Sequence, residues 1–189
     1  MHVMFAGGDE TQHMMSVQGH GISTATAALI NQGRERRATL RALNIWSSAR
    51  ENGEIPLLSS LTESAHRAGQ REVFTANQFL ILFEPYSSNS VIIFYGHDLP
   101  ELPSLRMAGK NLHETLPAAL TGIFHDACVE AAGNGDAVYR HGSIRLPSGV
   151  DVLYRSIFMP LRSASQNGRI YIFGAFCSEQ NGTELLAAA

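Results

Sequence analysis

Hydrophobic residues dominate three consecutive stretches near the end of the chain, at 137–146, 150–161 and 169–177. Each stretch is rich in β-branched and aromatic residues, and the breaks at 147–149 and 163–168 contain Gly with Pro, Ser or Asn. Such runs with short turn-forming connections predict three antiparallel strands in a meander. The middle stretch is apolar at both odd and even positions, which predicts a sheet covered on both faces.

A second strand pattern precedes this meander. Two nearly continuous apolar runs, 77–84 and 90–96, are separated by a short polar turn at 85–89. This arrangement predicts a hairpin that is buried on both faces. Residues 97–109 have an irregular pattern with two prolines, and helical periodicity returns over 116–132 until Gly and Asn end it at 133–135.

The pattern ahead of the hairpin is helical. An apolar stripe over 34–52 predicts an amphipathic helix that docks on the back of the sheet. The stripe consists of Leu40, Leu43, Trp46 and Ala49, widened by Ala42 and Ile45. We predict a dimer or partner contact through Leu40, Leu43 and Trp46, whereas the arginines at the start of the helix are interpreted as a solvated helix end. A second short helix is predicted over 57–68.

The order of the elements predicts an α+β fold. It consists of a five-stranded antiparallel sheet, helices inserted between the second and third strands, and an N-terminal helix packed on the outer face. The predicted division is a flexible arm at 1–33 with a helical turn near 25–30, a domain at 34–178 that begins with the helix 34–53, and a tail at 179–189.

Composition limits the kind of protein. The net charge of −3 argues against a sequence-independent nucleic-acid binder, which normally carries a basic stripe. No run approaches the roughly 18 apolar residues of a membrane helix, and no signal peptide is recognisable. Cys128 and Cys177 form neither a disulfide framework nor a metal motif, which favours a cytoplasmic setting.

From about Arg37 to Cys177 the chain resembles a PAS sensory domain, of the compact type found as short bacterial regulatory proteins. The resemblance rests on the buried hairpin, residues 109–112 entering the helical segment, the helix ending at Gly133, the segments 144–150 and 154–161, and the closing strand with Gly174 and Ala175. It implies a sheet whose concave face, with the inserted helices, encloses a pocket for a small molecule. The predicted ligand contacts are Phe79, Ile81, Phe94, Leu112, Phe124, Tyr139, Arg145 and Tyr154.

A haem site is the alternative at one position. His125-Asp126 resembles the His-Asp pair of oxygen-sensing haem PAS domains, in which a histidine on this helix ligates iron. A neutral imidazole is a good haem ligand when an acceptor orients its other nitrogen. The competing interpretation is a surface or half-buried histidine, and no cofactor is assigned.

Two classes of function follow. The preferred one is a non-catalytic sensory or signalling module that binds a small ligand or a protein partner and regulates by helix repacking or dimerisation. Its expected partners are a second copy of the chain and a downstream signalling protein, with no nucleic acid and no membrane. The alternatives are a gas or redox sensor with haem on His125 and a small enzyme with a pocket between helices and sheet. For an enzyme, the carboxylates are scattered and no triad-like spacing is present.

Overall fold

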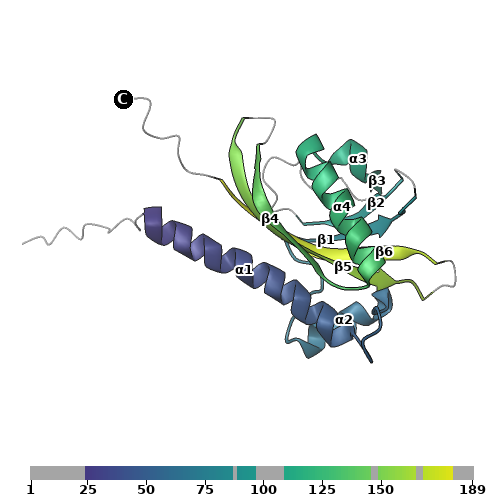
Figure 1. Cartoon of the computed structure of the whole chain (residues 1–189). Coiled ribbons are helices and arrows are strands. Elements are labelled where there is room, and N and C mark those ends of the chain that lie inside the picture. The colour runs from purple at the N-terminus through teal and green to yellow at the C-terminus, as the bar shows by residue number, and fades with distance from the viewer. Residues whose placement is uncertain (1–23, 87–88, 97–108, 146–148, 165–167, 181–189) are drawn as a thin grey trace, which may run out of the picture.

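The computed structural model describes residues 24–86, 89–96, 109–145, 149–164 and 168–180 (Figure 1). Most of the predicted arm (1–23) and of the predicted tail (181–189) therefore lies outside the described residues. The elements, in chain order, are α1 (Thr24–Ala49), the single turn η1 (Leu58–Ser60), α2 (Leu61–Arg67), β1 (Gln78–Phe83), β2 (Val91–Tyr95), β3 (Lys110–Asn111), α3 (Leu112–Thr115), α4 (Ala118–Asn134), β4 (Val138–Arg145), β5 (Asp151–Arg162) and β6 (Ile170–Gln180).

The strands form one antiparallel sheet in the order β3-β2-β1-β6-β5-β4. The predicted hairpin and meander are confirmed, but the sheet has six strands and the prediction of five is wrong. The additional strand, β3, has two polar residues that pair with Val91 and Ile92 at the start of β2. A two-residue strand is too short to show the alternation on which sequence-based prediction depends.

Helix α1 begins earlier than predicted. It starts at Thr24, ten residues before the predicted start at Arg34, so the C-terminal part of the predicted arm is helical. The added segment contains Ala and Leu, which favour helix, but it also contains Gly33 and several polar residues that interrupt the apolar period. A helix of this kind is difficult to recognise from hydrophobic periodicity alone.

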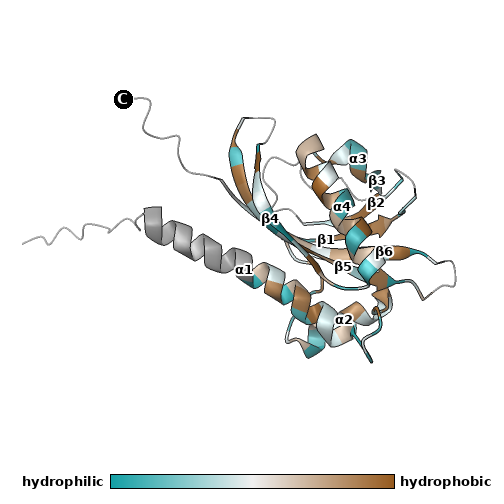
Figure 2. Ribbon diagram, viewed as in Figure 1, coloured by the Kyte–Doolittle hydropathy of each residue, from teal (hydrophilic) through white to brown (hydrophobic). Residues whose placement is uncertain are grey.

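The sheet carries helices on both faces (Figures 1 and 2). Helix α4 contacts β4, β5 and β6 on one face, here called the inner face, and α1 contacts β5 and β6 on the other, the outer face, where it also contacts α2. Each face has its own hydrophobic core. The inner core is rich in aromatic residues, and the outer core contains Ala42, Ile45, Trp46 and Ala49 of α1.

The centre of the sheet has no room for an additional side chain. Gly174 of β6 pairs with Phe79 of β1 and Phe158 of β5. A Cβ atom at position 174 would lie 2.2 Å from the carbonyl oxygen of Ile157 and 2.3 Å from the ring of Phe79. Glycine is required here because the Phe79 ring lies directly over the β6 backbone.

Candidate functional site

Five of the eight predicted ligand contacts lie together in the inner core. Phe79, Ile81, Leu112, Phe124 and Tyr154 are all buried there. The aromatic rings in this core pack directly on one another. The ring centroids are 5.1 Å apart for Phe79 and Phe124, 5.0 Å for Phe124 and Phe158, 5.7 Å for Phe124 and Phe176, and 5.6 Å for the stacked pair Tyr154 and Phe176. The centre of the inner face is therefore occupied by side chains of the protein itself.

The other three predicted contacts lie elsewhere. Phe94 belongs to the outer core, where its ring packs on Phe74 at 4.7 Å. The register between β1 and β2 shifts at Leu80/Ile81, and such an irregularity reverses which residues of a strand face the core. Tyr139 is exposed on β4, and Arg145 is exposed at the end of the same strand, 4.0 Å from Asp151. The eight residues do not form one lining, and ligand binding by the buried five stays a prediction.

His125 lies at the edge of the inner core. Its side chain is half-buried, its ring centroid is 6.2 Å from that of Phe83 and 5.8 Å from that of His113, and its Nδ1 is 3.5 Å from Asp126 Oδ1. Haem needs an apolar cavity beside its axial ligand. The buried ring of Phe83 instead lies against the His125 ring on its core side, so these residues do not fit haem. In the part of the chain described here, no group of three potential metal ligands is present.

The described carboxylates considered for an enzyme come from three different segments. Glu84 follows β1, Glu114 lies on the short helix α3, and Asp126 is exposed on α4 beside His125. Asp98 and Glu101 lie outside the described residues.

The three predicted dimer residues of α1 have different surroundings. Trp46 is only 2% exposed, and its Nε1 donates a 2.8 Å hydrogen bond to the carbonyl oxygen of Pro160 on β5. Leu43 is half-buried against the outer core. Leu40 is 54% exposed. The predicted stripe recurs every three residues, whereas an α-helix advances about 100° per residue, so Leu40 and Ala49 lie about 180° apart.

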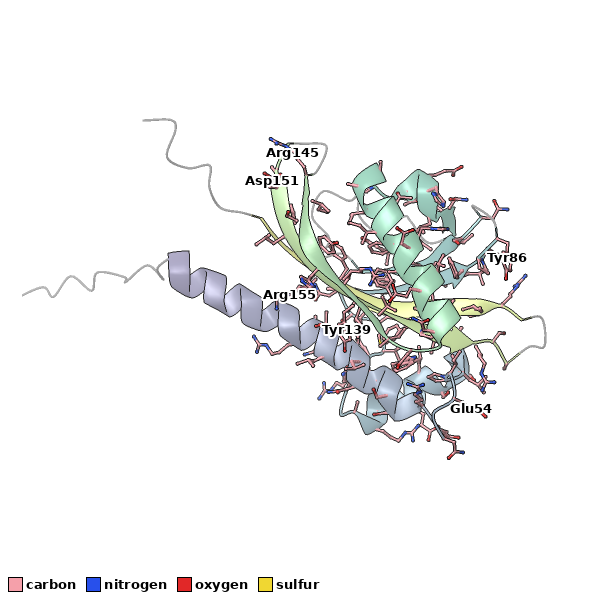
Figure 3. The ribbon with its side chains drawn as sticks, viewed as in Figure 1. Glu54, Tyr86, Tyr139, Arg145, Asp151 and Arg155 are labelled. Atoms are coloured by element: carbon pink, nitrogen blue, oxygen red, sulfur yellow. The ribbon has the colours of Figure 1, made fainter. Side chains whose placement is uncertain are left out.

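Exposed Leu40 lies on one wall of a groove between α1 and the β4–β5 hairpin. The groove has a volume of about 400 Å³ and is called here the outer groove. Its lining consists of Thr39 and Leu40 from α1, Tyr139, Arg140 and His141 from β4, and Arg155 and Ser156 from β5. Figure 3 shows Tyr139 and Arg155 next to α1, with Arg145 and Asp151 at the far end of the hairpin.

Tyr139 presents an aromatic ring in the outer groove. It is 54% exposed, and Leu153 on the neighbouring strand is also exposed. The pKa of Tyr139 is raised, mainly by partial burial of the phenol and to a lesser extent by the nearby carboxylate of Asp136. Its hydroxyl therefore stays protonated at neutral pH. Sequence reasoning missed the groove because Tyr139 was assigned to the inner face. The alternation Val138, Tyr139, Arg140 could have indicated that the aromatic ring and the buried valine face opposite sides.

No family model matches the sequence, and no curated protein matches it. Among solved structures, the chain is similar to a variant of the PAS-B domain of Drosophila melanogaster Cycle with bound glycerol, with 10% identity, 53% of this chain and 99% of that chain covered, and a TM-score of 0.38. It is also similar to VqmA bound to DPO, with 18% identity, 52% of each chain covered and a TM-score of 0.37. A third similar structure is the ligand-binding domain of the Pseudomonas aeruginosa chemoreceptor PctC in complex with GABA, with 15% identity, 83% of this chain and 57% of that chain covered, and a TM-score of 0.30.

The chain spans about half the length of the VqmA chain that it matches. All three TM-scores are below 0.5, so the description of the fold rests on the order of elements in this chain. That order is a hairpin, two inserted helices, and a three-stranded meander that completes one antiparallel sheet. The fold is PAS-like. Within the described residues, no helix is both long and apolar enough to span a bilayer.

Proposed function

We propose that the chain is a non-catalytic, PAS-like signalling module that works through protein association at the outer groove. The partner is a second copy of the chain or a downstream signalling protein. In this proposal, binding at the groove changes how α1 packs against the sheet, and that repacking is the regulatory output.

The observation that carries the proposal is the pairing of Leu40 on α1 with Tyr139 on β4 across an open groove, each about half exposed. An aromatic residue and an aliphatic residue that are both exposed in one groove are typical of the centre of a protein interface. His141 and Arg155 line the same groove and would form the polar rim.

The position of the groove supports repacking of α1 as the output. One wall belongs to α1 and the other to the sheet, so a bound partner contacts both elements at once. Further along the same helix, Ala42, Ile45 and Trp46 hold α1 on β5 and β6. Because a ligand shifts an equilibrium only by its different affinities for the two states, a partner that spans both walls is able to favour one packing of α1.

A charge placed at Leu40 tests the proposal. We expect light scattering over the micromolar range to show self-association of the wild-type protein, and Leu40→Asp to weaken it about tenfold or more. Val129→Asp is the matched control, because Val129 is also an exposed apolar residue on a long helix but lies on α4. A monomeric wild-type protein throughout this range would refute self-association. Equal weakening by both variants would refute the outer groove as the interface.

A further inference from the structure

An adjacent face of α1 borders a second, larger groove, called here the basic groove. It has a volume of about 700 Å³ and lies between α1 and the segment that follows α2. Its lining consists of Arg37, Leu40, Arg41 and Asn44 from α1, and Ala68, Gly69, Gln70, Arg71, Glu72 and Thr75 from the segment. The assignment of a function to the outer groove leaves this site unexplained. We propose that the basic groove binds an acidic peptide segment of a partner protein.

The net charge of the groove is opposite in sign to that of the whole chain. Three arginines and one glutamate line it, which gives a net charge of +2 in a protein whose net charge is −3. Within the described residues, neither Arg41 nor Arg71 forms an ion pair. Several other arginines are paired with carboxylates, namely Arg50 with Asp136 at 3.1 Å, Arg162 with Glu54 at 2.8 Å, Arg145 with Asp151 at 4.0 Å, and Arg140 with Glu130. The guanidinium groups of Arg41 and Arg71 remain available to a carboxylate, which each can bind through two parallel hydrogen bonds.

The wall that carries Arg71 is held in place. Gly69 ends α2 in the left-handed conformation, with a φ of 73°, and the N–H of Gln70 donates to the carbonyl oxygen of Ala65 at 2.8 Å. The Gln70 side chain donates from Nε2 to the carbonyl oxygen of Arg41 at 3.4 Å, which links the segment to α1. Val73, two residues beyond Arg71, is buried in the outer core. A groove with fixed walls loses little conformational entropy when a ligand binds.

The lining fits a peptide better than a small inorganic anion. Leu40 is about half exposed between Arg37 and Arg41, so the arginines flank an apolar surface. Arg37, Leu40, Arg41 and Asn44 have the spacing of one helix face and extend over about 10 Å of α1. A segment with carboxylates on either side of an apolar side chain matches both the charge and the length. Glu72 also lines the groove and repels a carboxylate placed beside it, which favours a segment whose carboxylates lie next to the arginines.

The test uses the full chain and a short synthetic peptide of Glu-Glu-Leu repeats. We expect fluorescence anisotropy at low ionic strength to show saturable binding that weakens as salt is added. Arg41→Glu/Arg71→Glu is expected to weaken binding about tenfold or more, because it replaces two attractive charges by two repulsive ones. Arg145→Glu/Arg169→Glu changes the net charge by the same amount at exposed positions outside the groove, and it is expected to retain binding within about twofold. Both variants are expected to show the far-UV circular dichroism of the wild type.

Several outcomes would overturn the proposal. One is equal weakening by the two double variants, because it would indicate attraction to the whole protein and not to the groove. Another is equal binding of a peptide in which Gln replaces Glu. Complete displacement of the peptide by inorganic phosphate at low concentration would assign the site to a small anion. Tighter binding of a peptide that spans residues 1–15 of this chain, which contains Asp9 and Glu10, would assign it to the chain's own N-terminus. Failure of peptide binding at the basic groove and failure of association at the outer groove are distinguishable, because Arg41 and Arg71 do not line the outer groove.

Discussion

Replacing Trp46 by phenylalanine tests how strongly α1 is held on the sheet. The indole is almost completely buried in the outer core, and its N–H donates to the carbonyl oxygen of Pro160 at 2.8 Å. Arg50 lies over the ring, with its Cζ 4.9 Å from the ring centroid. Phenylalanine retains most of the apolar contact and the stacking of Arg50 but cannot donate the hydrogen bond.

The expected cost follows from these contacts. Loss of a buried donor that leaves its acceptor unpaired costs about 1–3 kcal/mol, and the smaller ring adds a cavity to that loss. We therefore expect Trp46→Phe to reduce the free energy of unfolding by about 1–3 kcal/mol and Trp46→Ala to reduce it by about 3–5 kcal/mol. Tyr86→Phe, at a fully exposed position, is the control and is expected to change stability by less than about 0.5 kcal/mol.

Urea denaturation followed by far-UV circular dichroism measures these differences. A Trp46→Phe variant within about 0.5 kcal/mol of the wild type would refute the reasoning, because the hydrogen bond and the packing of the indole would then contribute nothing. Trp46 is the one tryptophan of the chain, so its fluorescence in the wild type reports on α1 directly. If α1 detaches before the sheet unfolds, the fluorescence transition occurs at lower urea than the circular dichroism transition.

Three further predictions concern the cores. Gly174→Ala is expected to destabilise the protein by about 1–3 kcal/mol or more in the same denaturation assay, because the new Cβ overlaps the carbonyl oxygen of Ile157; unchanged stability would contradict the close packing of the sheet centre. Burial raises the pKa of the Tyr95 phenol well above its usual value. The unfolded chain therefore loses this proton first, and stability is expected to decrease above pH of about 10, by at most about 1.4 kcal/mol per pH unit for this group. Tyr95→Phe should reduce this loss of stability at alkaline pH. A variant whose stability has the same pH dependence as the wild type would show that Tyr95 does not cause the loss. Purified protein supplied with haem is expected to show no Soret band, and a band that disappears in His125→Ala would overturn the conclusion that the residues around His125 do not fit haem.

The long strands could be predicted from the sequence because their residues and their turns agree. β4, β5 and β6 are rich in β-branched and aromatic residues, and they are separated by breaks that contain glycine. Their bounds were predicted to within three residues. β3 could not be predicted in this way, because a two-residue strand has too few periodic positions. For the start of α1 the sequence predicted only a helical turn near 25–30, because polar residues and Gly33 interrupt the apolar period before Arg34.

The site was less predictable because it depends on which face each side chain occupies. Five of the predicted ligand contacts, which come from the hairpin, the helices and β5 and were grouped by the resemblance to a PAS domain, lie together in the inner core. Phe94 was assigned to the wrong face, because the irregularity in the β1–β2 pairing has no signature in the apolar run 91–95. Leu40 was grouped with Trp46 by a three-residue period, and the true helical period separates them. Grooves formed by segments distant in the sequence, such as α1 and β4, have no local signal at all.

Leu40 lines both grooves, so it forms the ridge between them. Two occupants that share one side chain cannot bind independently, since each alters the rotamer and the solvation that the other encounters. Thermodynamic linkage requires the effect to be mutual. If an acidic segment in the basic groove changes the affinity of association at the outer groove by some factor, association changes the affinity for the acidic segment by the same factor. A single leucine on α1 would then couple two binding equilibria, with no need for a rearrangement deep in the sheet.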